Sequence, residues 1–409
     1  MPRTAGATGR RRAAVGAVAV AVACALAVGR WWPGPPRWIP LERAAADRVA
    51  AQVTGLEPWL HSGGPLPGAG TPYAGLAARA LADLRALTTP AGGATAGPAG
   101  AWRYVWPRDA SFVAVALAVA GHRDDAVAVL RHLARLPLEP TGFQARYLPD
   151  GSGAVPDQRG IEADGVGWVL WAADQVSATT PDPASVVATL TPLVDRCAAV
   201  AHRITDDGRS LPPPSRDYWE VRERRVTLGT AAPLLAGLSA AARLHRIAGR
   251  TADAAQDTVA AARLAGLVRS QFGPRYGRHR GDRHRDAAIA FLLPPFVPGP
   301  PDPALLHAWA AVQTTTLRPA GGLAPGEAWP DDGISWTPET AAFAVTAAAL
   351  GRRPVAEHWL GWLAAHRTPD GAVPEKVLAD GAPAAVAPLA WTDAEIVLAV
   401  VLLGRAEAG

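Results

Sequence analysis

The chain has 409 residues, of which 49% are apolar and 19% charged, so it is long enough for one large domain or two average ones. Its formal net charge is only +4, and the one basic tract is Arg10–Arg12. This composition gives no indication of nucleic-acid binding, which requires a basic patch or stripe. Cys24 lies in an N-terminal apolar run, which leaves Cys197 as the single cysteine of an exported chain, so a disulfide framework is excluded there.

The N-terminus predicts an export or anchoring segment. Arg10–Arg12 precede an uninterrupted Ala/Val-rich run over residues 13–29, a pattern typical of signal peptides. The run is short against the roughly 20 residues of a spanning helix, which favours export, with membrane tethering through 13–29 as the alternative. We therefore expect a signal peptide or anchor over 1–30, a Trp/Pro-rich linker over 31–40, and an extracytoplasmic protein.

Helical patterns separated by Gly, Pro and Asp turns dominate the chain from about residue 41, with hardly any alternation of period two. This pattern predicts an all-α domain over 41–409. The expected helices cover 41–54, 73–88, 107–120, 123–135, 161–178, 183–204, 226–248, 251–271, 285–293, 303–317, 336–350, 353–366 and 389–407.

The predicted helices differ in how they distribute apolar residues. Those over 107–120 and 336–350 are apolar nearly all round, which is typical of buried helices, whereas 251–271 is amphipathic. An inner ring of buried helices wrapped by an outer amphipathic ring would produce this contrast. A helical solenoid is the alternative, but the sequence shows no fixed repeat period, which favours a closed barrel.

The stretch WRYVWPRD over residues 102–109 directly precedes the buried helix 107–120. Pro107 suits the first turn of a helix, where its missing N–H costs nothing. Polar groups at the end of a buried helix are costly to desolvate unless they have partners or a function. Arg108 and Asp109 are therefore either a helix-start ion pair with the tryptophans as core, or part of a site.

Three more acid-bearing stretches lie between the predicted helices: EADGVGW over 162–168, RDYWEVR over 216–222 and GAVPEKV over 371–377. Each has a simple explanation on its own. Asp164 could cap a helix, Glu220 could form a surface ion pair with Arg222 or Arg224, and Glu375 could be solvated in its loop. None of the three indicates catalysis alone.

The four stretches together resemble the catalytic domain of glycoside hydrolase family 15, which includes glucoamylases, glucodextranases and some trehalases. The matching motifs are YVWPRD over 104–109, DGVGWVLW over 164–171, DYWE over 217–220 and VPE over 373–375. They occur in the order of the family with comparable spacing. The resemblance covers about residues 85 to 405.

The resemblance implies an (α/α)6 barrel, a six-hairpin toroid, whose loops at one end form a funnel for the non-reducing end of an α-glucan. It assigns the general acid to Glu220 and the general base to Glu375. It also implies that Arg108 and Asp109 hold the hydroxyl groups of the terminal sugar. With aromatic rings as platforms for flat sugar faces, the candidate substrate-binding residues are Trp102, Trp106, Arg108, Asp109, Asp164, Trp168, Asp217 and Trp219.

These residue types suit hydrolysis with inversion, which needs one protonated carboxyl at the leaving oxygen and one carboxylate that activates water, about 6.5 to 9.5 Å apart. Aromatic surroundings favour the protonated form of a carboxyl group, which suits Glu220 beside Tyr218 and Trp219. The open loop of Glu375, with Lys376 adjacent, is compatible with an ionised base.

The sequence thus predicts an inverting exo-glycosidase that releases terminal α-linked glucose. A trehalase or an α-1,6-glucan hydrolase is the alternative within enzymes. The chain departs from the family pattern at Val221, where a second glutamate is common, and over 322–329, which lacks an arginine. A carbohydrate-binding protein of weak activity is therefore a second alternative.

The remaining expectations concern partners and structural residues. We expect an α-glucoside or oligosaccharide as substrate, a monomer, and no requirement for a metal ion or other cofactor. Trp171 and Cys197 should be structural, because each lies on the apolar face of a predicted helix. His279 and His284 should be surface residues of an Arg-rich loop.

Overall fold

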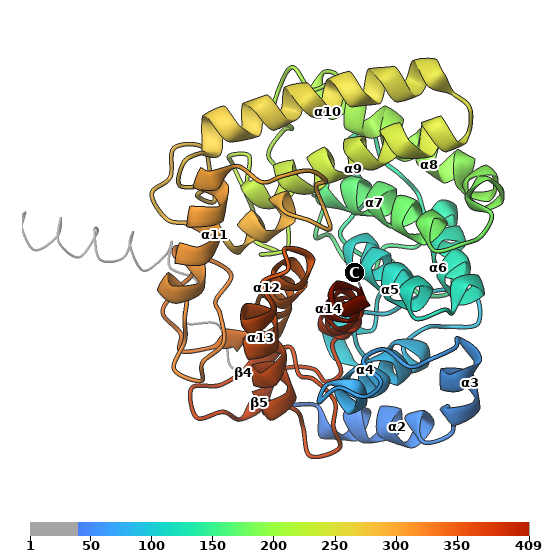
Figure 1. Ribbon diagram of the computed structural model, residues 1–409, viewed down its shortest axis with the longest axis vertical. Helices are drawn as coiled ribbons and strands as arrows, with labels where there is room; N and C mark the ends of the chain where they lie inside the picture. The colour runs from blue at the N-terminus through green and yellow to red at the C-terminus, as the bar shows by residue number, and fades with distance from the viewer. Residues whose placement is uncertain (1–39, 409) are drawn as a thin grey trace, which may run out of the picture. The chain divides into compact units, whose positions relative to one another are not determined.

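The computed structural model describes residues 40–408, which belong to one compact unit (Figure 1). The predicted export segment and most of the predicted linker lie outside the described residues. In chain order the α-helices are α2 (Arg43–Val53), α3 (Glu57–Ser62), α4 (Ala74–Ala86), α5 (Pro107–Val119), α6 (Arg123–Arg135), α7 (Asp164–Ala178), α8 (Pro183–Thr205), α9 (Leu228–Ile247), α10 (Thr251–Phe272), α11 (Pro303–Thr315), α12 (Thr337–Ala349), α13 (Arg353–Ala365) and α14 (Ala390–Ala408). Two 3-10 helices, η1 (Gly100–Trp102) and η2 (Ala287–Leu292), complete the set.

The helices form two concentric rings. From α5 to α14, α5 packs on α7, α7 on α9, α9 on η2, η2 on α12 and α12 on α14, and α14 closes the inner ring against α5. Each inner element is backed by an outer helix: α6 on α5, α8 on α7, α10 on α9, α11 on η2, α13 on α12 and α4 on α14. Figure 1 shows α5, α7, α9, α12 and α14 around the centre. The predicted all-α (α/α)6 barrel is confirmed.

Burial explains the contrast between the predicted helices. Almost every side chain of α5 and α12 is buried, whereas α10 buries one stripe and exposes the rest. Of the described helices, α8 alone is long and apolar enough to cross a membrane by length and composition, and it packs here as an outer helix against α7 and α9.

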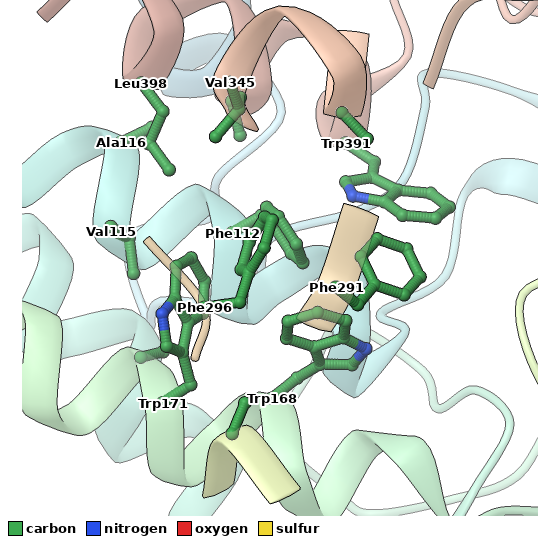
Figure 2. Packing of buried hydrophobic residues seen from close by; sticks show 14 of the residues in the cluster. Phe112, Val115, Ala116, Trp168, Trp171, Phe291, Phe296, Val345, Trp391 and Leu398 are labelled. Carbon is green, nitrogen blue, oxygen red and sulfur yellow. The ribbon is translucent and has the colours of Figure 1, made fainter. Parts of the chain in front are cut away.

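An aromatic cluster fills the centre of the inner ring (Figure 2). The ring of Phe112 lies 4.9 Å from that of Trp168 and 5.0 Å from that of Trp171, measured between centroids. Phe291 meets Trp168 edge-on at 4.9 Å, a geometry that aromatic pairs favour. Trp171 and Cys197 are fully buried, which confirms both as structural residues.

Two elements differ from the helical pattern in the sequence. The segment expected as a helix over 285–293 is only the short 3-10 helix η2, because Asp286 accepts a hydrogen bond from Ala288 N–H at its start and two prolines follow at its end. A residue before proline is disfavoured in helical conformation. The unpredicted α3 is a six-residue helix, too short for a periodic signal.

Short strands connect the loops that lead into the inner helices. Strand β1 (Phe143–Gln144) pairs with β2 (Ile161–Glu162), and β3 (Ser335–Trp336), β4 (Lys376–Val377) and β5 (Pro383–Ala384) form a three-stranded sheet, all antiparallel. Trp336 thereby faces Lys376 across the sheet. A single parallel bridge joins Glu162 to Arg216. These pairings fix loops that are distant in sequence at one end of the barrel.

Candidate functional site

The candidate site lies at the N-terminal ends of the inner helices. Each outer helix returns the chain alongside its inner partner, so successive inner helices run in the same direction and begin at the same end of the barrel. Acidic or aromatic residues stand at or just before these starts. They are Trp106 and Asp109 at α5, Asp164 at α7, Asp286 at η2, Trp336 and Glu339 at α12, and Trp391 at α14.

Arg108, in the first turn of α5, is the centre of a buried acidic cluster. Its Nη1 donates to Asp164 Oδ2 at 2.8 Å and to Glu162 Oε2 at 3.0 Å, and its Nε lies 3.6 Å from Asp109 Oδ2. All four side chains are buried. Asp164 is the first residue of α7 and follows its N-cap, Ala163, so it is the partner of an arginine and not the helix cap.

The cluster holds more carboxyl groups than its arginine neutralises. Burial raises the pKa of Glu162 to about 8 and that of Asp109 to about 6, although Arg108 opposes both shifts. Burial raises the pKa of Asp164 as well. For Arg108, the three acids outweigh the effect of burial and raise its pKa. Arg108 is therefore charged, whereas the acids share protons and offer both donors and acceptors near neutral pH.

Several buried polar atoms of this cluster have no hydrogen-bond partner. They are Arg108 Nε, Asp109 Oδ2, Glu162 Oε1 and Asp164 Oδ1, together with the indole N–H groups of Trp106, Trp336 and Trp391. Unpaired buried polar atoms are costly and rare in folded proteins. So many at one end of the barrel indicate a place built for a ligand with many hydroxyl groups.

Glu220 stands at the end of a tight turn that Asp217 organises. Asp217 is fully buried, and its Oδ1 accepts hydrogen bonds from the Trp219 N–H at 3.0 Å and from Arg278 Nη2 at 2.7 Å. The Glu220 N–H donates to Asp217 O at 2.7 Å, and Glu220 has a left-handed φ of 54°. Asp217 thus positions Glu220, whose side chain is 32% exposed.

Trp219 begins a row of three tryptophans. The guanidinium of Arg278 lies 3.8 Å from the Trp219 ring centroid and also pairs with Asp286 at 3.2 Å. Trp329 meets Trp219 edge-on at 4.9 Å and Trp336 at 5.1 Å between ring centroids. This row connects the loop of Glu220 to the start of α12.

Glu375 is held by its backbone and by two side chains. Its N–H donates to Val386 O at 2.8 Å, and its carbonyl oxygen accepts from the Thr337 N–H at 3.0 Å. Trp102 Nε1 donates to Glu375 Oε1 at 3.2 Å, and Lys376 Nζ lies 3.4 Å from Oε2. These contacts fix the orientation of the carboxyl group, and the side chain keeps 14% of its surface exposed.

Arg159 is the residue that pairs with Glu220. Its Nη1 donates to Glu220 Oε2, and its guanidinium lies 5.7 Å from the centroid of the Trp106 ring. The sequence offered Arg222 and Arg224 as possible partners but gave no indication of Arg159. Arg159 lies in a loop without periodicity, 61 residues before Glu220, so no local pattern pointed to it.

Trp168 corrects one prediction. Its side chain is 0% exposed, and its ring packs against Phe112, Phe291 and Phe296 in the core. It therefore has no free face on which a sugar could stack, although its buried indole N–H has no hydrogen-bond partner, as in Trp106, Trp336 and Trp391. The aromatic residues that remain at the site from the predicted set are Trp102, Trp106 and Trp219.

His279 corrects another prediction. Its side chain is 13% exposed, and it bridges Glu223 at 2.8 Å and Asp282 at 2.9 Å, so it is a partner of two acids. His284 is exposed, as predicted.

Eight residues of the site fall outside the predicted set: Arg159, Glu162, Arg278, Asp286, Trp329, Trp336, Glu339 and Trp391. A signal for some of them exists in the sequence. Trp336 stands just before a helix that begins with Thr337-Pro338, much as Trp106 stands before Pro107. An aromatic residue before a proline-started apolar helix would have indicated both.

No family model matches this sequence, and no curated protein matches it either. Several solved structures do match the fold of this chain. A glycosidase in complex with glucose superposes with a TM-score of 0.70 at 21% identity, over 81% of this chain and 96% of that one. A bacterial glucoamylase complexed with acarbose gives a TM-score of 0.66 at 19% identity over 81% and 55%, and the glucoamylase of Saccharomycopsis fibuligera gives 0.64 at 12% over 92% and 99%. The fold is that of the glucoamylases.

Proposed function

We propose that the protein is an inverting glycoside hydrolase of family 15 that releases glucose from the non-reducing ends of α-linked glucosides. The observation that carries the proposal is the placement of Glu220 and Glu375. Both are partly exposed carboxyl groups at the barrel end where the unpaired buried polar atoms gather. The structural similarity to glycosidases and glucoamylases supports the same reaction class.

The buried cluster around Arg108 is the proposed binding site for the terminal glucose. Its atoms without a hydrogen-bond partner include the acceptors Glu162 Oε1 and Asp164 Oδ1, which hydroxyl groups can satisfy. Satisfying buried polar atoms gives a ligand both affinity and orientation. One similar structure contains glucose and another acarbose, which supports a sugar as the ligand.

In the proposed mechanism, Glu220 transfers its proton to the glycosidic oxygen as the bond to C1 breaks. Glu375 accepts a proton from a water molecule that attacks C1 from the opposite face, so the product has inverted configuration. Arg159 stabilises the carboxylate that forms on Glu220 as its proton departs, since opposite charge developing in the transition state favours the reaction. Exchange of protons with solvent restores both groups.

Following product anomers by NMR during hydrolysis of maltooligosaccharides tests the mechanism. We expect β-glucose first, and initial α-glucose would rule out inversion. Glu220→Gln and Glu375→Gln should each remove most turnover, while the control Glu57→Gln, a side chain 72% exposed outside the site, should not. A panel of maltose, isomaltose and trehalose identifies the linkage, and binding without hydrolysis of all three would indicate a carbohydrate-binding protein instead.

We also propose that the protein acts outside the cytoplasm as a monomer, tethered or released according to whether residues 13–29 are cleaved. The charged and apolar pattern of the N-terminus supports export. Mass measurement of the N-terminal peptide of the protein produced in an exporting host distinguishes cleavage from tethering.

A further inference from the structure

Positive charge gathers on the side of Glu220. Arg146 is buried, and it donates to Asp157 and to the carbonyl oxygen of Ala101. Arg159 shares the same acid, with its Nε 3.4 Å from Asp157 Oδ2, and also donates to Glu220. Two guanidinium groups thus compete for Asp157, and Glu220 serves as the second partner of Arg159.

Arg216 adds a third guanidinium. It is half-buried, and its Nη1 donates to the carbonyl oxygen of Glu220 at 3.0 Å. Within residues 40–408 it forms no ion pair with a carboxylate. When Glu220 is ionised, the three positive charges of these arginines are therefore matched by two negative charges, on Asp157 and Glu220.

The excess of positive charge is larger when Glu220 is protonated, as its role as general acid requires. A general acid must be protonated, and Asp157 is then the single carboxylate left for three guanidinium groups. Glu162 also attracts Arg159 electrostatically, but it is bound to Arg108 at 3.0 Å, and burial raises its pKa to about 8. It therefore carries little negative charge with which to compensate near neutral pH.

The leaving group must come close to these arginines. For proton transfer, the glycosidic oxygen has to lie within hydrogen-bond reach of the Glu220 carboxyl, about 2.6 to 3.2 Å. Arg159 already touches this carboxyl, and Arg216 touches the backbone of the same residue. Whatever is attached to that oxygen therefore lies within a few ångströms of two guanidinium groups, at least one of which lacks a carboxylate partner.

We propose that the preferred leaving group carries an acidic function, a carboxylate or a phosphate, which Arg159 and Arg216 bind. The proposal rests on the proposed glycosidase function and names the substrate class of the same site. Guanidinium groups bind both anions through paired, charge-assisted hydrogen bonds, and the Trp106 ring beneath Arg159 keeps that guanidinium oriented. A neutral sugar in this place would leave the excess charge uncompensated.

Matched substrate pairs test the proposal. Maltobionate and maltitol share the α-1,4-glucosyl bond and an open-chain leaving group, and they differ in a carboxylate. Trehalose 6-phosphate and trehalose differ in a phosphate on the leaving glucose. We expect kcat/KM to be about tenfold or more higher for the anionic member of at least one pair, as expected for a charge-assisted bond formed in the transition state. The pair with the larger ratio identifies the acidic group.

Variants link the ratio to the arginines. Arg216→Gln should bring the ratio of anionic to neutral substrate close to one, whatever it does to the neutral substrate alone, and Arg159→Gln should do the same with an additional loss of kcat. Arg222→Gln is the matched control, because this arginine lies on the same loop and is exposed, and it should keep the wild-type ratio. Raising the salt concentration should lower the wild-type ratio, because ions screen exposed charges.

The outcomes separate the two proposals. If no member of either pair is hydrolysed and maltose and isomaltose also stay intact, the glycosidase proposal fails and this inference with it. If only maltose or isomaltose is hydrolysed, the glycosidase proposal stands and the acidic leaving group is refuted. If hydrolysis occurs but the neutral members react as fast as the anionic ones, the glycosidase proposal stands and the acidic leaving group is refuted. A ratio that survives Arg216→Gln and Arg159→Gln equally contradicts the role of these two residues.

Discussion

The Arg108 guanidinium is the charge on which the buried acids depend. Asp164 and Glu162 accept its hydrogen bonds, and Asp109 lies beside it, all of them buried at the start of α5 and α7. An ionised carboxylate without a partner in such surroundings is strongly unfavourable, so removing the arginine forces the acids to take up protons.

Arg108→Met should therefore destabilise the protein in a pH-dependent way. We expect a loss of about 3 kcal/mol in the free energy of unfolding at pH 7.5, the size seen when one partner of a buried pair is removed. The loss should be smaller at pH 5, because acids of raised pKa are neutral there at little cost. Urea unfolding at both pH values measures it, with the exposed Arg222→Met as control. An equal loss at both values would contradict the dependence of the acids on Arg108.

Trp102 is a positioning residue for Glu375. Its indole N–H donates to Glu375 Oε1 at 3.2 Å, which fixes the orientation of the carboxyl group. Trp102→Phe keeps an aromatic ring but removes the donor. We expect kcat to fall roughly tenfold with KM little changed, because the base loses its orientation and hydrogen bonds to charged groups contribute about 1.5–3 kcal/mol.

The separate changes in kcat and KM distinguish this role from simple packing against the substrate. Trp359→Phe, on the outer helix α13, removes an indole hydrogen bond to Gln313 without touching the site, and it should leave both constants unchanged. A Trp102→Phe variant with a higher KM and an unchanged kcat would show that Trp102 acts through packing alone.

At the scale of elements, apolar periodicity was sufficient to predict the two rings. Helices such as α6, expected and found over 123–135, have clear apolar faces and end at turn residues. The same reasoning failed for η2, where a proline pair and the Asp286 cap shorten an apolar segment. Apolar periodicity predicts which residues of a helix are buried. It does not predict how long the helix can be, because the residues that flank it set its ends.

The candidate site was predictable where its residues follow one another in sequence and not where they meet across loops. Trp106, Arg108 and Asp109 form one motif at one helix start, so a single stretch revealed them. Arg159 lies in an irregular loop 61 residues before Glu220 and donates a hydrogen bond to its carboxylate. The residues next to either position in the sequence do not predict this contact. Trp168 was assigned to the sugar platform because it lies one turn after Asp164 at the start of α7. The first residue of this helix lies at the site, whereas Trp168 packs in the core.

A chain of histidines and acids connects α8, α9 and α10. His202 lies between Asp207 at 2.9 Å and Asp257 at 2.7 Å, and His245 contacts the other oxygen of Asp257 at 2.6 Å. The hydrogen bond to Asp257 is the largest cause that raises the pKa of both histidines. Because the folded pKa exceeds the unfolded value, this stabilisation is complete below the unfolded pKa of about 6.5 and is lost as pH rises through the folded pKa.

Asp257→Asn should therefore destabilise the protein more at pH 6 than at pH 8.5. At pH 6 the variant loses two charge-assisted hydrogen bonds, whereas at pH 8.5 the wild-type protein has already lost much of their contribution. Thermal unfolding at the two pH values provides the comparison, and Asp253→Asn, on the exposed side of α10, is the control. An equal loss at the two pH values would show that the histidines do not lose their charge between pH 6 and pH 8.5.

At the scale of the whole molecule, the inner ring buries acidic side chains that have no arginine beside them. Glu339 begins α12 and Glu395 lies in α14, and both are fully or almost fully buried. Burial raises the pKa of Glu339 to about 8 and that of Glu395 well above its usual value. The folded protein therefore holds protons that the unfolded chain releases above about pH 4.5.

Glu395→Gln should stabilise the protein at high pH and have little effect at low pH. A carboxyl group whose folded pKa is raised favours folding below its unfolded pKa, and this advantage is lost as pH rises through the folded value. In the wild-type protein at pH 8.5, folding must therefore either keep Glu395 protonated or bury its charge.

The glutamine side chain of the variant has nearly the same shape and does not titrate. We expect the unfolding midpoint of the variant to exceed that of the wild type by about 1 °C or more at pH 8.5, for a gain on the order of 1 kcal/mol or more, and to match it closely at pH 4, below the unfolded pKa. Calorimetry across this range measures both, with the exposed Glu57→Gln as control. A midpoint of the variant equal to or below that of the wild type at pH 8.5 would mean that Glu395 is ionised in the fold, with a partner that stabilises its charge.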